Sequence, residues 1–404
     1  MQSKLYKFLK EMKVFLYLRA MKPIFVFNPE HDLALANGDR HYIPPKNIRE
    51  MAHDLAPLME AALAYAEGDE TLPFATPVPQ PWGWDMAVSE RFAKMGFPAE
   101  QLPSDAALMA LCRRSERGTA HRLLSAFRAE HPDEAYVGES LMLRAADDIA
   151  PYAERYGHIL LKAPLSGSGK GLRHVSFNEN EDEDCRPDEK LASSLKKVES
   201  WANALIRRHG YLTAEPFYDK EADFAMEFYI SDAACHFIGY SLFITDHHGR
   251  YIESRLLSDE AIEESLTQYV SLESLREVRS WIIAHWRDIA PDEWDTARHP
   301  LYFGIDMMIV RGDRCHKLHP CIEVNLRLNM GIIAHELYRH RLSPEARGLF
   351  RLTFFPDSAA VRAFSAEQAC SHPATYHEGK LLSGYLPLTP IHDDTRHHAY
   401  ILCQ

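Results

Sequence analysis

The chain lacks the marks of three classes of protein. Its seven cysteines include no Cys-x-x-Cys pair and are odd in number, which predicts reduced thiols, as in the cytoplasm, and no disulfide framework. No run of about 18 uninterrupted apolar residues occurs, so no membrane-spanning helix is expected. Positive charge is outnumbered: 45 Lys and Arg face 58 Asp and Glu, and the net charge of −13 disfavours nonspecific nucleic-acid or membrane-surface binding. No internal repeat is present either.

The N-terminal segment lacks the features of a signal peptide. Lys13, Arg19 and Lys22 interrupt its apolar residues, and no small-residue cleavage site follows them. Residues 24–27 already form a strand-like run. We therefore interpret residues 1–20 as an N-terminal extension.

The composition is that of an ordinary soluble globular protein. With 404 residues, 46% of them hydrophobic and 25% charged, the chain can bury a large core and divide into two or three domains. Apolar residues at steps of three and four predict a helix over residues 191–205, with Gly210 as its C-cap. Other predicted elements are helices over 48–66 and 259–289, a helix from about 331, and adjacent antiparallel strands at 224–230 and 235–244.

Two short β-type runs near the C-terminal end each carry an acidic residue, Asp306 in one and Glu323 in the other. An isolated carboxylate buried among Ile, Val and Met costs several kcal/mol, so a cation is expected to compensate both. Glu323 and Asn325 are two apart and leave the same face of a strand, where Asp306 on the neighbouring run can meet them. Such oxygen ligands suit Mg²⁺, which adds water and phosphate oxygens. The three residues predict a magnesium-nucleotide site.

A second segment predicts a phosphate-binding loop. An apolar strand ends at Lys162, and the loop after it contains Ser166, Gly167, Ser168, Gly169, Lys170 and Gly171. The glycines let backbone amides approach a phosphate chain closely, and Lys170 adds a mobile cation. The loop is not a Walker A motif, because Pro164 stands in the place of the first glycine and Gly171 in that of the magnesium-binding Ser or Thr.

Together these two segments resemble the ATP-grasp superfamily, whose nucleotide lies between two α+β subdomains. The resemblance covers about residues 115–340 and depends on motifs that follow one another in the family's order. It implies that ATP and Mg²⁺ are the cofactors. The residues implied to bind them are Lys162, Ser166, Gly167, Ser168, Gly169 and Lys170 at the phosphates, Glu215, Pro216 and Phe217 at the adenine hinge, and Asp306, Glu323 and Asn325 at the metal.

Two further positions have alternatives within the resemblance. The acid near the ribose is Asp223, with Glu227 as the second candidate. The family's lysine near the α-phosphate is not obvious, and Arg122 or Arg117 stands in its place, since arginine can bind phosphate bidentately. Arg327 completes a Glu-x-Asn-x-Arg pattern, in which the arginine faces the transferring phosphate or acyl group. Arg327 and Lys162 are therefore the implied catalytic residues.

The resemblance also implies the fold class and the domains. An α/β fold is expected, with an N-terminal α/β domain before the α+β subdomains of the ATP-grasp unit. The expected divisions are an extension (1–20), a pre-ATP-grasp domain (21–114), a small ATP-binding subdomain (115–215) and a C-terminal subdomain with the magnesium site (216–404).

The implied activity is that of an ATP-dependent carboxylate–amine ligase, which forms an acyl phosphate that an amine or a similar nucleophile attacks. Its partners would be small-molecule carboxylate and amine substrates, with no nucleic acid and no membrane, and homodimer formation is left open. One alternative keeps the fold but phosphorylates a hydroxyl, as a small-molecule kinase does. Another is a nucleotide-binding protein without turnover.

Some polar residues outside these motifs have two interpretations. Ligands commonly bind at the carboxyl end of a first strand, but helix caps and turns use the same residue types. This applies to Asn28, Glu30, His31 and Asp32. Arg255 and Asn329 suit either a substrate contact or an ordinary surface or turn position. The segment between Cys315 and Cys321 suggests zinc, but one hairpin closes a tetrahedral site poorly.

Overall fold

The computed structural model describes residues 22–63, 77–166, 171–176, 187–246 and 251–404. Its strands are β1 (Lys22–Val26), β2 (Pro77–Pro81), β3 (Leu141–Leu143), β4 (His158–Lys162), β5 (Leu172–Ser176), β6 (Leu212–Pro216), β7 (Lys220–Ser231), β8 (Ala234–Thr245), β9 (Tyr251–Leu256), β10 (Leu301–Arg311), β11 (His316–Asn325), β12 (Gly348–Phe354), β13 (Thr375–His377), β14 (Lys380–Pro387) and β15 (His397–Cys403). Its helices are α2 (His31–Asn37), α3 (Lys46–Leu55), α4 (Pro57–Leu63), α5 (Met86–Lys94), η1 (Ala99–Gln101), α6 (Asp105–Ser115), α7 (Gly118–Glu130), η2 (Ala146–Asp148), α8 (Ile149–Tyr156), α9 (Pro187–His209), α10 (Asp259–Leu266), α11 (Leu272–Ala284), α12 (Trp286–Ile289), α13 (Met330–Arg341) and α14 (Ser358–Ser371).

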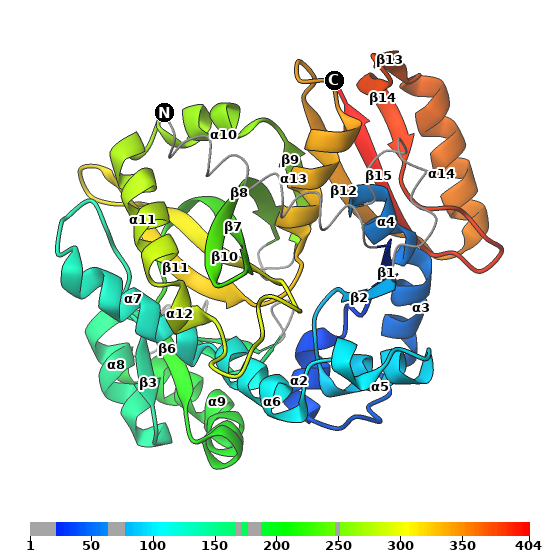
Figure 1. Cartoon of the computed structure of the whole chain (residues 1–404). Coiled ribbons are helices and arrows are strands. Elements are labelled where there is room, and N and C mark those ends of the chain that lie inside the picture. Colours follow the sequence, from blue (N-terminus) through cyan, green and yellow to red (C-terminus); the bar gives the residue numbers. More distant parts are fainter. Residues whose placement is uncertain (1–21, 64–76, 167–170, 177–186, 247–250) are drawn as a thin grey trace, which may run out of the picture.

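The strands form three sheets (Figure 1). The largest has the order β11-β10-β7-β8-β9-β12-β15-β14-β13, and its neighbouring strands are antiparallel. A smaller antiparallel sheet, β3-β6-β4-β5, forms a lobe with α8 and α9 beside it. β1 and β2 pair in parallel near α3, α4 and α5. The predicted α/β class is confirmed, because helices and both parallel and antiparallel strand pairs make up the chain.

The small lobe presents the predicted loop as a hairpin connection. β4 and β5 are antiparallel, and Lys162 at the end of β4 lies opposite Leu172. The pairing continues into the loop, because the Ala163 amide donates to the Gly171 carbonyl over 2.8 Å. Residues 167–170, and with them the predicted contacts of Gly167, Ser168, Gly169 and Lys170, lie outside the described residues.

Alternation along the central strands separates a core face from a polar face. On β10, Phe303, Ile305 and Met307 are buried in the main hydrophobic core. Asp306 lies between two of these residues and points to the opposite face, because successive side chains of a strand alternate. β7 follows the same alternation and places Glu227 on that polar face. The polar face of β7, β10 and β11 is where the candidate site lies.

Helices cover both sides of the large sheet. Side chains of α6, α7, α10 and α11 fill the main core on the apolar face of β7 and β10. A second core joins α4 and α13 to β12 and β15, so the N-terminal part packs against the last strands of the chain. β12, β14 and β15 continue the large sheet, although the sequence predicted no elements for the last sixty residues.

Several predicted elements differ in detail. The helix expected over 48–66 is two helices, α3 and α4, separated at Ala56. The helices expected over 259–289 are α10, α11 and α12, and the Ser271 side chain begins α11 by accepting from the Ser274 amide. α2 is a helix that the sequence did not predict. The helix at 191–205 is confirmed as part of α9, and Gly210 follows it with a φ of 82°.

Six of the seven cysteines lie within the described residues. None of them forms a disulfide; they are Cys112, Cys235, Cys315, Cys321, Cys370 and Cys403. Within the described residues, no helix combines the length and the apolar character that crossing a membrane requires.

Candidate functional site

The predicted metal ligands lie together on the polar face of two paired strands. Asp306 of β10 is directly opposite Glu323 of β11, and Gly304 is opposite Asn325. The Asn325 Nδ2 donates to Asp306 Oδ2 over 3.2 Å. Burial raises the pKa of Asp306 well above its ordinary value, and the carboxylates of Glu323 and Glu227 raise it further. The expectation that the acids share one face is therefore confirmed, and a bound cation would relieve their repulsion.

The donor set fits magnesium better than a metal held by protein ligands alone. Among the residues that the structure describes, no group of three or more His, Cys, Asp or Glu side chains is arranged to hold a metal ion. Asp306, Glu323 and Asn325 offer two carboxylates and one amide, so other ligands would have to complete a coordination shell. Mg²⁺ is commonly held in this way, with water and phosphate oxygens at the remaining positions. The metal role of the three residues remains a prediction.

Arg117 connects the glycine-containing loop to the acidic strand. It precedes α7, and its guanidinium donates to the Ala163 carbonyl (3.1 Å), to Ser166 Oγ (2.9 Å) and to Glu323 Oε1 (3.0 Å). The side chain is buried, and its Nε–H has no hydrogen-bond partner among the described residues. A buried donor without a partner is costly, and a phosphate oxygen is the kind of acceptor that would satisfy it.

Arg122, the other candidate, contacts different groups. Its guanidinium donates to Thr119 Oγ1, one turn earlier on α7, over 2.9 Å. The structure therefore brings Arg117, and not Arg122, into contact with Ser166 and Glu323. The phosphate role of Arg122 remains untested, but the contacts favour its alternative.

We expect Arg117→Gln to weaken ATP binding by about tenfold or more, because a charge-assisted hydrogen bond contributes ~1.5–3 kcal/mol. Arg122→Gln should have a clearly smaller effect. Calorimetric titration of both variants with ATP and magnesium measures the difference, and Arg128→Gln, at the other end of α7, is the matched control. A larger loss in Arg122→Gln than in Arg117→Gln would reverse the assignment.

Lys162 lies at the end of β4 in the small sheet, where the glycine-containing loop begins. It is 3% exposed, and its Nζ lies 2.5 Å from Glu215 Oε2 on β6. The two residues sit on one face because Lys162 pairs with Thr213, two residues before Glu215. The buried ion pair keeps each charge satisfied. A triphosphate bound at the loop after β4 would give Lys162 a second anionic partner, and Lys162 would not have to leave its place at the end of β4.

The predicted hinge spans the end of β6, which contains Glu215 and Pro216, and the residue after it, Phe217. Phe217 is half exposed, and its ring stacks on His158 with a centroid distance of 4.2 Å. Tyr218 contacts His319 edge to face at 5.5 Å. Burial, followed by the positive charge of Lys162, lowers the pKa of His319 to about 3, so this imidazole is neutral. His319 is a site neighbour; for its segment the sequence left packing, site lining and zinc as alternatives.

The two ribose candidates occupy different surroundings. Asp223 accepts from Thr245 Oγ1 over 2.8 Å and forms an ion pair with Lys220 near the start of β7. Glu227 is buried and accepts from Asn329 Nδ2 (2.8 Å) and Ser241 Oγ (2.9 Å). Asp223 is the more accessible of the two.

Glu227 belongs instead to the buried part of the site. Burial raises its pKa to about 7, although Asn329 and Ser241 stabilise the charged form. A Cβ on Gly304 or Gly331 would overlap its carboxylate, which explains the glycines at both positions. Asn329 also caps α13 by accepting from the Ile332 amide over 2.9 Å. Its role is thus a helix cap and a partner of Glu227.

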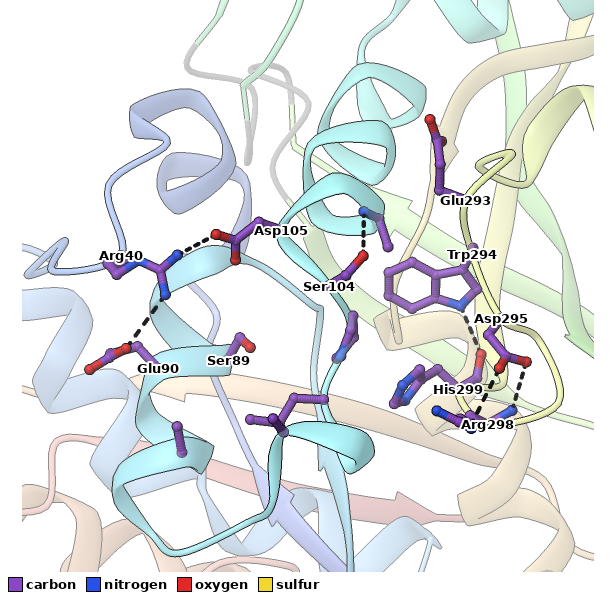
Figure 2. Close-up of a pocket in the computed structure, with 15 residues that line it drawn as sticks. Arg40, Ser89, Glu90, Ser104, Asp105, Glu293, Trp294, Asp295, Arg298 and His299 are labelled. Atoms are coloured by element: carbon purple, nitrogen blue, oxygen red, sulfur yellow. Dashed lines mark hydrogen bonds and ion pairs between the residues drawn. The ribbon is translucent and has the colours of Figure 1, made fainter.

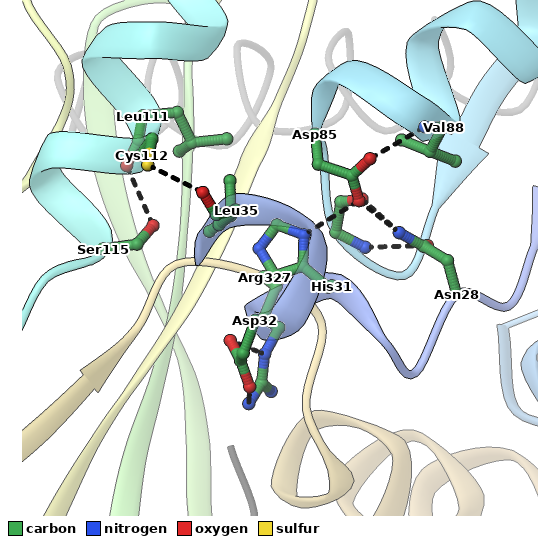
Figure 3. Close-up of polar contacts among 11 residues, drawn as sticks. Asn28, His31, Asp32, Leu35, Asp85, Val88, Leu111, Cys112, Ser115 and Arg327 are labelled. Atoms are coloured by element: carbon green, nitrogen blue, oxygen red, sulfur yellow. Dashed lines mark hydrogen bonds and ion pairs between the residues drawn. The ribbon is translucent and has the colours of Figure 1, made fainter. Parts of the chain in front are cut away.

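Arg327 joins the site to the N-terminal part of the chain (Figure 3). Its Nη2 lies 3.1 Å from Asp32 Oδ2, and its Nε lies 3.4 Å from Asp32 Oδ1. Burial alone would raise the pKa of Asp32, but the charges of Arg327 and His31 lower it, so Asp32 is ionised. The sequence left the role of Asp32 open, and the structure places it beside the predicted catalytic arginine.

The other residues of the first loop support local structure. Asn28 Nδ2 donates to the Gly83 carbonyl (2.8 Å) and to Asp85 Oδ2 (3.0 Å), and Asp85 caps α5. His31 is buried, with Nδ1 3.4 Å from the same carboxylate oxygen of Asp85 (Figure 3). These contacts favour a structural role for Asn28 and His31.

Arg255 lies exposed on β9. A cavity of about 530 Å³ between α5, α6 and the segment 293–299 contains none of the predicted site residues (Figure 2). Its charged side chains largely pair with one another: Arg40 with Glu90 and Asp105, and Arg298 with Asp295. We assign no ligand to this cavity.

Comparisons with known proteins give similarities of fold. No protein-family model and no curated protein sequence matches the chain. The structure is similar to N5-carboxyaminoimidazole synthase from Aspergillus clavatus, solved with ADP and 5-aminoimidazole ribonucleotide (12% identity, 95% of this chain, 94% of that chain, TM-score 0.48). It is also similar to biotin carboxylase from Campylobacter jejuni (13% identity, 96% of this chain, 85% of that chain, TM-score 0.46). A third similar structure is D-alanyl-alanine synthetase A from Vibrio cholerae (12% identity, 80% of this chain, 94% of that chain, TM-score 0.40). These likenesses concern the fold alone, and the chemistry has to be inferred from the residues of this chain.

Proposed function

We propose that the chain is an ATP-dependent ligase that activates a substrate carboxylate as an acyl phosphate and joins it to an amine or a similar nucleophile. The observation that carries this proposal is the convergence of two parts at Arg117. This one guanidinium contacts Ser166, at the start of the glycine-containing loop, and Glu323, opposite Asp306. Phosphate-binding and magnesium-binding groups would thus lie within reach of one nucleotide.

In the first step, a carboxylate oxygen of the substrate attacks the γ-phosphorus of ATP. The bond between that phosphorus and the β,γ-bridging oxygen breaks, and ADP leaves. Asp306, Glu323 and Asn325 would hold Mg²⁺, which offsets the charge of the phosphoryl group when bound. Lys162 and Arg117 would fix the phosphates, and Arg327 would face the acyl phosphate, where Asp32 fixes its orientation.

In the second step, the amine nitrogen attacks the acyl carbon. The bond from this carbon to the phosphate oxygen breaks, phosphate leaves with the electron pair, and the nitrogen loses a proton to give the amide. Catalysis then consists of positioning and charge stabilisation, and no side-chain nucleophile is required.

A hydroxylamine trap tests the proposal directly. The protein is incubated with ATP, magnesium and a panel of small carboxylates, and both ADP and hydroxamate are measured. Hydroxylamine converts an acyl phosphate into a hydroxamate but leaves a phosphate ester intact. We expect ADP and hydroxamate in equal amounts with at least one carboxylate. ADP formation with a stable phosphate ester would identify a kinase instead, and binding of ATP without ADP formation on any substrate would overturn both.

A further inference from the structure

A second cavity lies next to the candidate site, between the N-terminal part and the last strands of the chain. It has a volume of about 540 Å³, which is within the usual range for small-molecule sites. Its walls come from the β1–α2 loop and α2, from α3, and from β12 and the start of β15. Parts of the chain more than 300 residues apart therefore enclose it.

Asp32 connects this cavity with the candidate site. Asp32 lines the cavity, and its carboxylate is the partner of Arg327. Both side chains are partly exposed, at 24% for Asp32 and 17% for Arg327. A ligand in the cavity would therefore present one end to the residue that we place beside the acyl phosphate.

Arg396 and His397 occupy another part of the wall. Asp54, which is 5% exposed, accepts from the backbone amides of Arg396 and His397 (2.9 Å each) and from His397 Nδ1 (3.1 Å). This buried carboxylate positions both residues and turns the Nδ1 edge of His397 away from the cavity. The opposite nitrogen, Nε2, has no partner among the described residues.

The Arg396 guanidinium contacts its neighbours by stacking, and it donates no hydrogen bond within the described residues. It lies 4.6 Å above the centroid of the exposed Phe354 ring. Its Nη1 is 3.8 Å from Glu50 Oε2, which is longer than a hydrogen bond, and its buried Nε has no partner among the described residues. A planar guanidinium whose Nη donors make no hydrogen bond within the described residues suits a carboxylate. The Nε2 of His397 is an acceptor, because Nδ1 carries the proton that Asp54 accepts.

We propose that this cavity binds the amine substrate and that this substrate is an amino acid, with its carboxylate at Arg396 and its amino group towards Asp32. The inference depends on the proposed ligase function and names the class of its nucleophile. The ends of the cavity match the charges of a zwitterion, and Asp32 places the amino group near Arg327. Phe354 and Met51 offer apolar contacts for a side chain.

Binding without nucleotide separates this proposal from the activity. The full chain is titrated calorimetrically with the standard amino acids and with their C-terminal carboxamides. We expect one or a few amino acids to bind, and each corresponding carboxamide to bind about tenfold or more weakly, because it cannot accept charge-assisted hydrogen bonds from Arg396. If no amino acid binds, the proposal is overturned, while a positive hydroxylamine trap would leave the ligase function intact.

Substitutions locate the binding site. Arg396→Gln should weaken the binding of the amino acid by the same factor as its conversion to the carboxamide does. The affinity for the carboxamide itself should change little. Glu50→Gln should leave amino-acid binding unchanged or tighten it, because it frees the guanidinium. Arg362→Gln, an exposed arginine paired with Asp393 outside the cavity, is the matched control. Thermal unfolding confirms that each variant is folded.

Should Arg396→Gln unfold, Arg396→Lys retains the charge without the planar fork and should give an intermediate loss of affinity. Wild-type affinity in either Arg396 variant, or an equal loss in Glu50→Gln and Arg396→Gln, would overturn the assignment.

Discussion

Asp306→Asn and Glu323→Gln should each lower magnesium-dependent ADP formation by at least roughly a hundredfold, a loss typical of removing one group that stabilises transition-state charge. Each substitution replaces a carboxylate that would hold the cation by a neutral amide of the same shape. ADP formation over a range of magnesium concentrations measures the effect. Asp313→Asn, an exposed carboxylate in the turn between the same two strands, is the matched control.

The same variants should keep their fold, which separates lost chemistry from lost structure. Burial and the neighbouring carboxylates raise the pKa of Asp306, so its ionised form opposes folding at neutral pH. We therefore expect Asp306→Asn to unfold at the same temperature as the wild type or higher when magnesium is absent. Wild-type ADP formation in both variants would remove the two acids from the mechanism.

Removal of the Lys162 charge should raise the dissociation constant of magnesium-ATP by about ten- to a hundredfold, since a hydrogen bond to a charged group contributes ~1.5–3 kcal/mol. Lys162→Gln alone would leave Glu215 buried and unpaired, at a cost of ~3–5 kcal/mol. The double variant K162Q/E215Q removes both charges and avoids this penalty. Calorimetric titration with magnesium and a non-hydrolysable ATP analogue measures the affinity.

The single variant Glu215→Gln is the matched comparison for this pair. It keeps the Lys162 ammonium and frees it from its only ion-pair partner among the described residues. Its affinity for the analogue should therefore exceed that of the double variant. Equal affinities in the wild type and in both variants would show that Lys162 does not hold the phosphates.

The residues that share a local pattern could be predicted from the sequence. Asp306, Glu323 and Asn325 share a face because side chains alternate along a strand, and the pairing of β10 with β11 connects the two runs. The hairpin at Lys162 follows equally from one apolar strand and its glycines. In both cases, residues close in sequence determine the geometry.

Contacts between distant segments could not be predicted in the same way. Asp32 and Arg327 are 295 positions apart, and nothing near either residue indicates their ion pair. The choice between Arg117 and Arg122 depends on how α7 meets β11 across the main core. α2 begins at His31, and its N-cap residue Glu30 makes no side-chain cap, so the helix carries no start signal. Tertiary packing decides each of these features.

The most direct test is a crystal structure of the chain with manganese in place of magnesium and a non-hydrolysable ATP analogue. Anomalous scattering then locates the metal independently of any fitted coordinates. We predict a manganese peak within direct coordination distance of Asp306 and Glu323, shared with phosphate oxygens that face Lys162 and Arg117. A bound analogue whose phosphates lie away from these residues, or a metal peak remote from both acids, would contradict the proposed site.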